Sequence, residues 1–109
     1  MAAAAPRFEL IYFDGPGNGQ MPRYMLALAG FEFTDTRNDG AAHAAMKAEG
    51  KFPMGKVPVL IDSEKGVTIG DSWAIVRYVA QEAGLYPDDR VEAALAEMIV
   101  STCHDIKSS

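Results

Sequence analysis

The stretch from Gly55 to Ser72 constrains the fold of this chain more than any other. Within it, Pro58 opens an apolar run, and a polar segment that ends in glycine separates this run from a second, shorter one. Proline has no backbone N–H and is accommodated only at the edge or the start of a strand. The stretch therefore predicts a strand at 57–61, a hairpin turn at 62–66 and a short edge strand at 67–69.

The same stretch ends on two polar residues, Asp71 and Ser72, which we expect to begin a helix. Side-chain oxygens of Asp and Ser accept hydrogen bonds from the free N–H groups of a first helical turn, where the positive end of the helix dipole lies. Apolar spacing predicts that this helix runs to Ala83 and ends at Gly84. Pro58 and the polar pair thus provide two points that we expect to face one ligand.

A strand, a helix and a second strand precede this stretch. The segment 8–13 is short, aromatic and β-branched, which is typical of a strand buried on both faces. A loop rich in glycine and proline at 14–19 follows, then a helical apolar pattern at 20–29 and an alternating pattern at 31–36. Because a strand–helix–strand crossover places its strands parallel in one sheet, we expect 8–13 and 31–36 in one sheet. A short helix is expected at 41–48.

A last helix is predicted after Pro87-Asp88-Asp89, since acidic residues favour a first turn. Its apolar residues recur at helical spacing and form one stripe: Val91, Ala94, Leu95, Met98, Ile99, Cys103 and Ile106. We expect this stripe to dock on the preceding domain, on further chain or on another protein. The expected organisation is a disordered tail at 1–7, a domain at 8–85 and the first helix of a truncated helical domain at 86–109.

Composition excludes several classes of function. The 109 residues suffice for about one domain, and a net charge of −5 without a basic cluster argues against nucleic acid as a partner. The one cysteine, Cys103, can form no internal disulfide and no Cys-x-x-Cys site, and we expect no metal site. The sequence shows neither a secretory signal pattern nor a run of about 18 apolar residues, so we expect a cytoplasmic protein without a membrane span.

Two segments together resemble the N-terminal thioredoxin-like domain of cytosolic glutathione transferases. They are Phe52-Pro53-Met54-Gly55-Lys56-Val57-Pro58-Val59-Leu60 and Gly70-Asp71-Ser72-Trp73-Ala74-Ile75-Val76-Arg77-Tyr78-Val79. The chain looks most similar to the Tyr-type, sigma-like class through Tyr12-Phe13, Arg23-Tyr24 and the runs at 26–30 and 97–100. The resemblance implies an α/β fold, a thioredoxin-like βαβ-αββα domain with a four-stranded mixed sheet, followed by one helix of a truncated all-α second domain.

The resemblance also assigns residues to a glutathione site. Tyr12 matches the hydroxyl that donates a hydrogen bond to the glutathione sulfur and favours the thiolate. Pro58 matches a cis-proline that leaves the backbone of Val57 free to bind the cysteinyl part of the tripeptide. Asp71 and Ser72 match the pair that binds the γ-glutamyl end, although relatives commonly have Gln or Glu where Asp71 stands.

Three further positions follow from the same resemblance. Lys56 precedes the Val–Pro pair, and either Lys47 or Lys51 is a candidate partner for the glycine carboxylate of glutathione. Asp105 matches an acid that reaches the glutathione of a neighbouring subunit in dimeric relatives. We therefore expect a homodimer, or another protein chain, to pack through the helix at 88–106.

The sequence leaves two functions open. One is a glutathione transferase, in which Tyr12 stabilises the thiolate of glutathione as co-substrate for attack on an electrophile. The other is a non-catalytic, glutathione-transferase-like structural or assembly subunit that docks through its last helix, since the basic residue that relatives place near Asn18 is absent. A disulfide reductase is disfavoured because residues 18–21 contain no cysteine.

Overall fold

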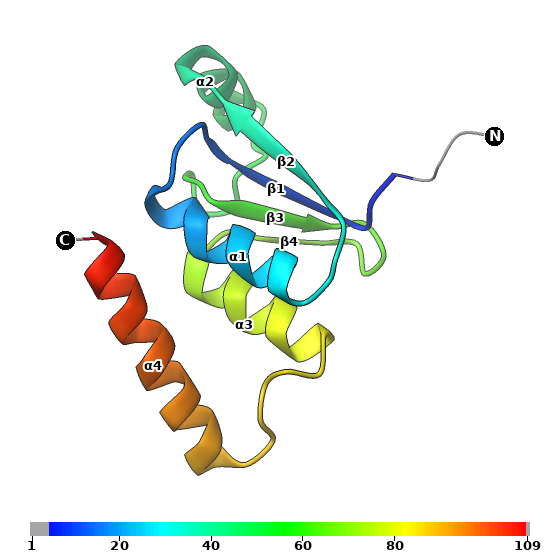
Figure 1. The fold of residues 1–109 in the computed structure, drawn as a ribbon. Coiled ribbons are helices and arrows are strands. Elements are labelled where there is room, and N and C mark those ends of the chain that lie inside the picture. The colour runs from blue at the N-terminus through cyan, green and yellow to red at the C-terminus, as the bar shows by residue number, and fades with distance from the viewer. Residues whose placement is uncertain (1–4, 109) are drawn as a thin grey trace.

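The structure, a computed structural model, describes residues 5–108 of the chain, and its account of side chains covers residues 5–102. This part of the chain forms a four-stranded sheet with helices packed on it and a last helix that lies outside them (Figure 1). The elements are, in order, β1 (Phe8–Phe13), the 3-10 turn η1 (Gly17–Gly19), α1 (Gln20–Leu28), β2 (Phe33–Asn38), α2 (Gly40–Ala48), β3 (Val59–Asp62), β4 (Val67–Ile69), α3 (Ser72–Glu82) and α4 (Arg90–Ser108).

The sheet has the strand order β2-β1-β3-β4, with β1 near its centre. The strands β1 and β2 are parallel, as a strand–helix–strand crossover requires, and β3 is antiparallel to both β1 and β4. The predicted four-stranded mixed sheet and the predicted order of helices and strands are therefore confirmed.

Two strands begin later than expected. The strand β2 starts at Phe33 rather than at residue 31, because its ladder with β1 begins where Phe8 faces Phe33. Phe31 instead packs its ring edge-on against Phe8, with the ring centroids 4.9 Å apart. The strand β3 starts at Val59 rather than at residue 57, since Pro58 has no N–H to give to the ladder.

Two apolar layers enclose the sheet. The larger layer lies between the sheet and the helices α1 and α3, and its fully buried members are Phe8, Leu10, Leu26, Leu60, Ile75 and Val79. The smaller layer consists of Ile11, Phe52 and Val59, against which Met46 of α2 packs. The two layers fix the strand ends and the start of α3, which is where the predicted ligand-binding residues lie.

Arg7, the residue just before β1, is bonded to the rest of the domain. Arg7, which we expected in a disordered tail, donates two hydrogen bonds of 2.8 Å to the carboxylate of Asp62 and also pairs with Glu82. The start of β1 is thereby tied to the end of β3 and to α3.

The helix α4 presents to the domain a different face from the one its sequence suggested. The side chains of Ala96, Glu97 and Val100 are half-buried, whereas the stripe residues Leu95 and Ile99 are 52% and 62% exposed. Met98 and Val91 are exposed as well. Of the three docking possibilities, packing of the stripe on the preceding domain is therefore wrong for its described residues. Across residues 5–108, no helix combines the length and apolar character needed to cross a membrane.

Candidate functional site

The topology brings the predicted binding residues to one end of the sheet. Tyr12 is next to the last residue of β1, and Ile11 faces Val59 at the start of β3, so Tyr12 lies near Pro58. The strand β4 ends at Ile69, opposite Leu60, so the chain that leaves β4 also emerges at this end and reaches Asp71 and Ser72 directly. Figure 1 shows this end on the left, where β1 turns toward α1 and α3 begins.

Tyr12 lies half-buried under the turn η1. Its hydroxyl oxygen accepts a hydrogen bond of 3.1 Å from the backbone N–H of Asn18. Its ring contacts Phe13 edge-on, with centroids 5.6 Å apart, and the guanidinium carbon of Arg23 lies 5.6 Å from the Tyr12 ring centroid. The hydroxyl is therefore held by a backbone donor, and a cation lies near its ring.

Arg23 is a functional candidate that sequence reasoning missed. It is buried in α1, where its guanidinium donates to the backbone carbonyls of Phe13 and Gly15 and to the carboxylate of Asp35. Buried arginines are almost always paired, and this one binds the backbone at the end of β1 and in the loop that follows it. The available signal was its spacing of three residues from the core residue Leu26, which places a charged residue on a buried helix face.

The peptide bond between Val57 and Pro58 is cis, as the resemblance implied. Pro58 is buried and Val57 is half-buried, immediately ahead of β3. The backbone of Val57 therefore lies at the same end of the sheet as Tyr12, two residues before β3 begins. A backbone N–H and C=O pair in such a position can bind a peptide ligand in the manner of an added strand.

Asp71 and Ser72 begin α3 as predicted. Asp71 is the N-cap, and its Oδ2 accepts a hydrogen bond of 3.0 Å from the backbone N–H of Ala74. Ser72 is the first helical residue and is half-buried. One carboxylate oxygen of Asp71 is thus used by the cap, which leaves the other to accept a bond from a ligand.

The lysines differ in their surroundings. The Cε atom of Lys47 lies 4.0 Å from the position that a Cβ would take at Gly55, so its side chain runs along the loop ahead of Pro58. Lys51 instead pairs with Glu49 at 3.5 Å. Of the two candidates for a carboxylate partner, Lys47 is the better placed. Lys56 is exposed in the same loop.

Asp105 lies in the last part of α4, outside the side chains that the structure describes, so its predicted role stays a prediction. Among the described side chains, no group of three or more His, Cys, Asp and Glu residues is arranged to hold a metal ion.

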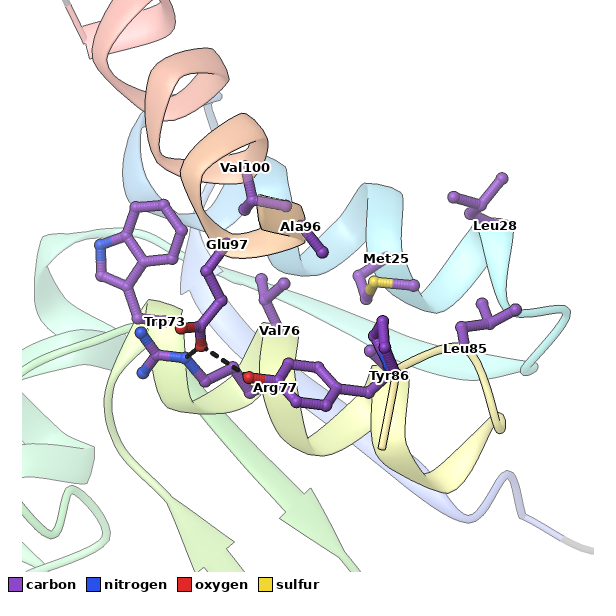
Figure 2. Close-up of a pocket in the computed structure, with 12 residues that line it drawn as sticks. Met25, Leu28, Trp73, Val76, Arg77, Leu85, Tyr86, Ala96, Glu97 and Val100 are labelled. Atoms are coloured by element: carbon purple, nitrogen blue, oxygen red, sulfur yellow. Dashed lines mark hydrogen bonds and ion pairs between the residues drawn. The ribbon is translucent and has the colours of Figure 1, made fainter. Parts of the chain in front are cut away.

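An apolar pocket lies elsewhere, between α4 and the pair α1 and α3 (Figure 2). It has a volume of about 310 Å³, and Met25, Val76 and Val100 are among the residues that line it. At its edge, the carboxylate of Glu97 accepts a hydrogen bond of 2.9 Å from the Tyr86 hydroxyl and pairs with Arg77. These bonds lower the pKa of Glu97 and raise that of Tyr86. None of the residues predicted to bind glutathione lines this pocket.

Comparison with known proteins identifies the family of this chain. The sequence model of the "Glutathione S-transferase, N-terminal domain" matches residues 8–81. Hematopoietic prostaglandin D synthase of Gallus gallus is 42% identical over 92% of this chain and 48% of its own length. A probable glutathione S-transferase of Caenorhabditis elegans, gst-36, is 34% identical over 95% of the chain and 48% of its own length.

Solved structures give the same result. The crystal structure of the glutathione S-transferase from Ascaris lumbricoides superposes with a TM-score of 0.78 at 31% identity, over 94% of this chain and 48% of that one. The chain spans about half the length of the curated relatives it matches. It belongs to the glutathione S-transferase family, whose thioredoxin-like N-terminal domain it contains.

Proposed function

We propose that this chain binds glutathione at the end of the sheet where Tyr12, Val57, Pro58, Asp71 and Ser72 meet, and that it activates the glutathione thiol. The observation that carries the proposal is this convergence of a tyrosine hydroxyl, the backbone ahead of a cis-proline and a helix start. Each of the three offers a different type of bond, and a tripeptide with a thiol and two charged ends can use all of them.

Different residues bind different parts of the tripeptide. The backbone of Val57 pairs with the cysteinyl unit, and Ser72 and the free carboxylate oxygen of Asp71 bind the γ-glutamyl end. Lys47 and Lys56 lie in or beside the loop ahead of Pro58 and attract the glycine carboxylate. Asp105 is a further contact, made to the glutathione of a neighbouring subunit in a homodimer.

The chemistry rests on the thiolate. A free thiol has a pKa of about 8.5 and is mostly protonated at neutral pH. A hydrogen bond from the Tyr12 hydroxyl to the sulfur stabilises the thiolate more than the thiol, so a larger fraction of bound glutathione becomes nucleophilic. The thiol proton passes to solvent, and the sulfur then attacks an electrophilic carbon and forms a thioether. That carbon either expels a leaving group with its bonding electron pair or, in an addition, passes a π electron pair to a neighbouring atom that takes up a proton.

Calorimetric titration with glutathione tests this proposal, with Tyr12→Phe as the matched variant. We expect both proteins to bind glutathione with similar affinity, and the variant to lose about 10- to 100-fold in turnover, because one hydrogen bond to a charged sulfur is lost. Absence of heat and of competition at about millimolar glutathione contradicts glutathione binding. Unchanged turnover in the variant contradicts the role of Tyr12.

A second function is favoured by one observation on α4. The stripe residues Val91, Leu95, Met98 and Ile99 are all more than half exposed, and they follow one another along the helix. We propose that this stripe joins the chain to a second copy or to another protein in the cytoplasm. Such a subunit need not be catalytic. A measurement of the oligomeric state of the chain tests whether the stripe joins two copies.

A further inference from the structure

The turn η1 lies so close to Tyr12 that only glycine fits at two of its positions. A Cβ atom built on Gly17 would lie 2.4 Å from the Tyr12 hydroxyl oxygen, and one built on Gly19 would lie 2.5 Å from Cδ2 of the same ring. Gly17 also has a φ of +42°, which favours glycine. The backbone of the turn therefore lies directly on the ring and the hydroxyl of Tyr12.

This close approach brings one backbone N–H, that of Asn18, to the hydroxyl oxygen at 3.1 Å. A tyrosine hydroxyl has two acceptor lone pairs and one proton. When an N–H donor occupies one lone pair, the hydroxyl proton points away from that donor. The oxygen is then oriented as a donor toward whatever lies on its other side.

Arg23 anchors the loop that leads from β1 into the turn. Its guanidinium donates to the carbonyl of Phe13 at 2.9 Å and to that of Gly15, and Asp35 holds it in place at 3.1 Å. The cation lies near the ring that the turn covers. The loop ahead of the turn is thus held to α1, and the turn itself is held to the Tyr12 hydroxyl.

We propose that the turn Gly17–Gly19 positions Tyr12, with the backbone N–H of Asn18 fixing the hydroxyl so that its proton is donated to the glutathione sulfur. The inference rests on the proposed function and extends it to a residue whose side chain plays no part. As the sulfur draws on the hydroxyl proton, negative charge builds on the phenol oxygen, and the Asn18 amide stabilises that charge. Asn18 is thus a positioning residue through its backbone.

The first experiment needs no glutathione. Amide hydrogen exchange of Asn18, followed by NMR in the wild-type chain and in Tyr12→Phe, reports the hydrogen bond directly. We expect exchange to be about 3- to 10-fold faster in the variant, because the acceptor is gone. Equal exchange rates in the two proteins overturn the inference, whatever the protein does with glutathione.

The second experiment titrates the thiol of bound glutathione by its thiolate absorbance. Asn18→Pro removes the N–H, and Asn18→Ala is its reference because it keeps the N–H. At neutral pH we expect about 3- to 10-fold less thiolate in the proline variant than in the alanine variant. Matching titrations in two variants that both bind glutathione overturn the inference and leave the proposed function standing.

A second pair of variants guards against a proline that disrupts folding. Gly19→Ala forces the turn away from Tyr12, whereas Gly15→Ala adds a Cβ into open space in the same loop. We expect loss of thiolate only in Gly19→Ala, and equal thiolate in both overturns the inference. Failure of the wild-type chain to bind glutathione refutes the proposed function itself, and the inference with it.

Discussion

The guanidinium of Arg7 binds the carboxylate of Asp62 through two hydrogen bonds of 2.8 Å, and Asp62 is completely buried. The Tyr78 hydroxyl donates a third bond to this carboxylate at 2.6 Å, and the backbone N–H of Glu64 a fourth at 3.0 Å. A buried carboxylate is tolerated only when such partners replace its hydration. This cluster lies at the opposite end of β1 from Tyr12 and holds the start of that strand.

We expect Arg7→Ala to destabilise the fold by about 2 kcal/mol, because it leaves a buried carboxylate with two bonds fewer. The midpoint of urea unfolding measures the loss. Arg90→Ala, at an exposed arginine that begins α4, is the control and should change the free energy of unfolding by less than about 0.5 kcal/mol. Equal midpoints for the two variants contradict a stabilising role for the Arg7–Asp62 pair.

The same cluster predicts a loss of stability in acid. The hydrogen bonds from Arg7 hold the pKa of Asp62 well below its usual range, and the Tyr78 hydroxyl adds to this effect. A group whose pKa is lower in the folded state stabilises the fold above its unfolded pKa of about 4 and loses that contribution as pH falls toward the folded value. Asp62→Asn should therefore flatten the fall in melting temperature below about pH 4. A wild-type curve that is already flat there argues against this assignment.

The alkaline side gives a separate prediction. Burial, together with the bond to Asp62, raises the pKa of Tyr78 to about 12. The unfolded chain then loses the Tyr78 proton near pH 10 while the folded chain keeps it, so stability falls as pH rises from about 10 to 12. Tyr78→Phe should be less stable than the wild type at pH 8 but should lose less stability between about pH 10 and 12. An equal fall in melting temperature for the wild type and Tyr78→Phe across that pH range contradicts the prediction.

Much of the fold was predictable because its signals are local. Glycine and proline at 14–19 mark the end of a strand, and Asp71 is a side-chain cap that needs only its own helix. The cluster around Asp62 was missed because its partner Arg7 is 55 residues away in the sequence. No local pattern distinguishes an arginine that ends a tail from one that anchors a strand.

The candidate site, like the fold, was predictable only in part. Spacing alone indicated that Pro58 and Asp71 face a ligand, and only the resemblance to a family named that ligand and added Tyr12. The bond from the Asn18 amide had no sequence signature, since every residue but proline carries a backbone N–H. The exposed face of α4 is visible in the sequence as a stripe. Which residues of the helix contact the domain depends on packing, however, and small side chains such as Ala96 make that contact.

A polar junction helps to attach α4 to the domain. Glu97 joins the helix to Arg77 of α3 and to Tyr86 of the connecting loop, beside the apolar pocket that Ala96 and Val100 help to line (Figure 2). We expect Glu97→Ala to increase amide exchange along α4 while leaving exchange in β1 unchanged, because the sheet has its own core. Glu92→Ala, at an exposed position on the same helix, is the control. Equal protection of α4 in both variants contradicts a role for the junction.

The exposed stripe of α4 predicts self-association or association with another chain. Leu95 and Ile99 lie one helical turn apart and are 52% and 62% exposed, so a glutamate at either position places a charge in the middle of any contact that covers them. We expect the wild-type chain to behave as a dimer in light scattering coupled to gel filtration, and Leu95→Glu and Ile99→Glu to shift it to the monomer. Glu32→Gln, at an exposed position outside α4, should leave the dimer intact. A wild-type chain that remains monomeric at about 100 μM excludes a tight second-copy contact and leaves another protein as the partner of this face.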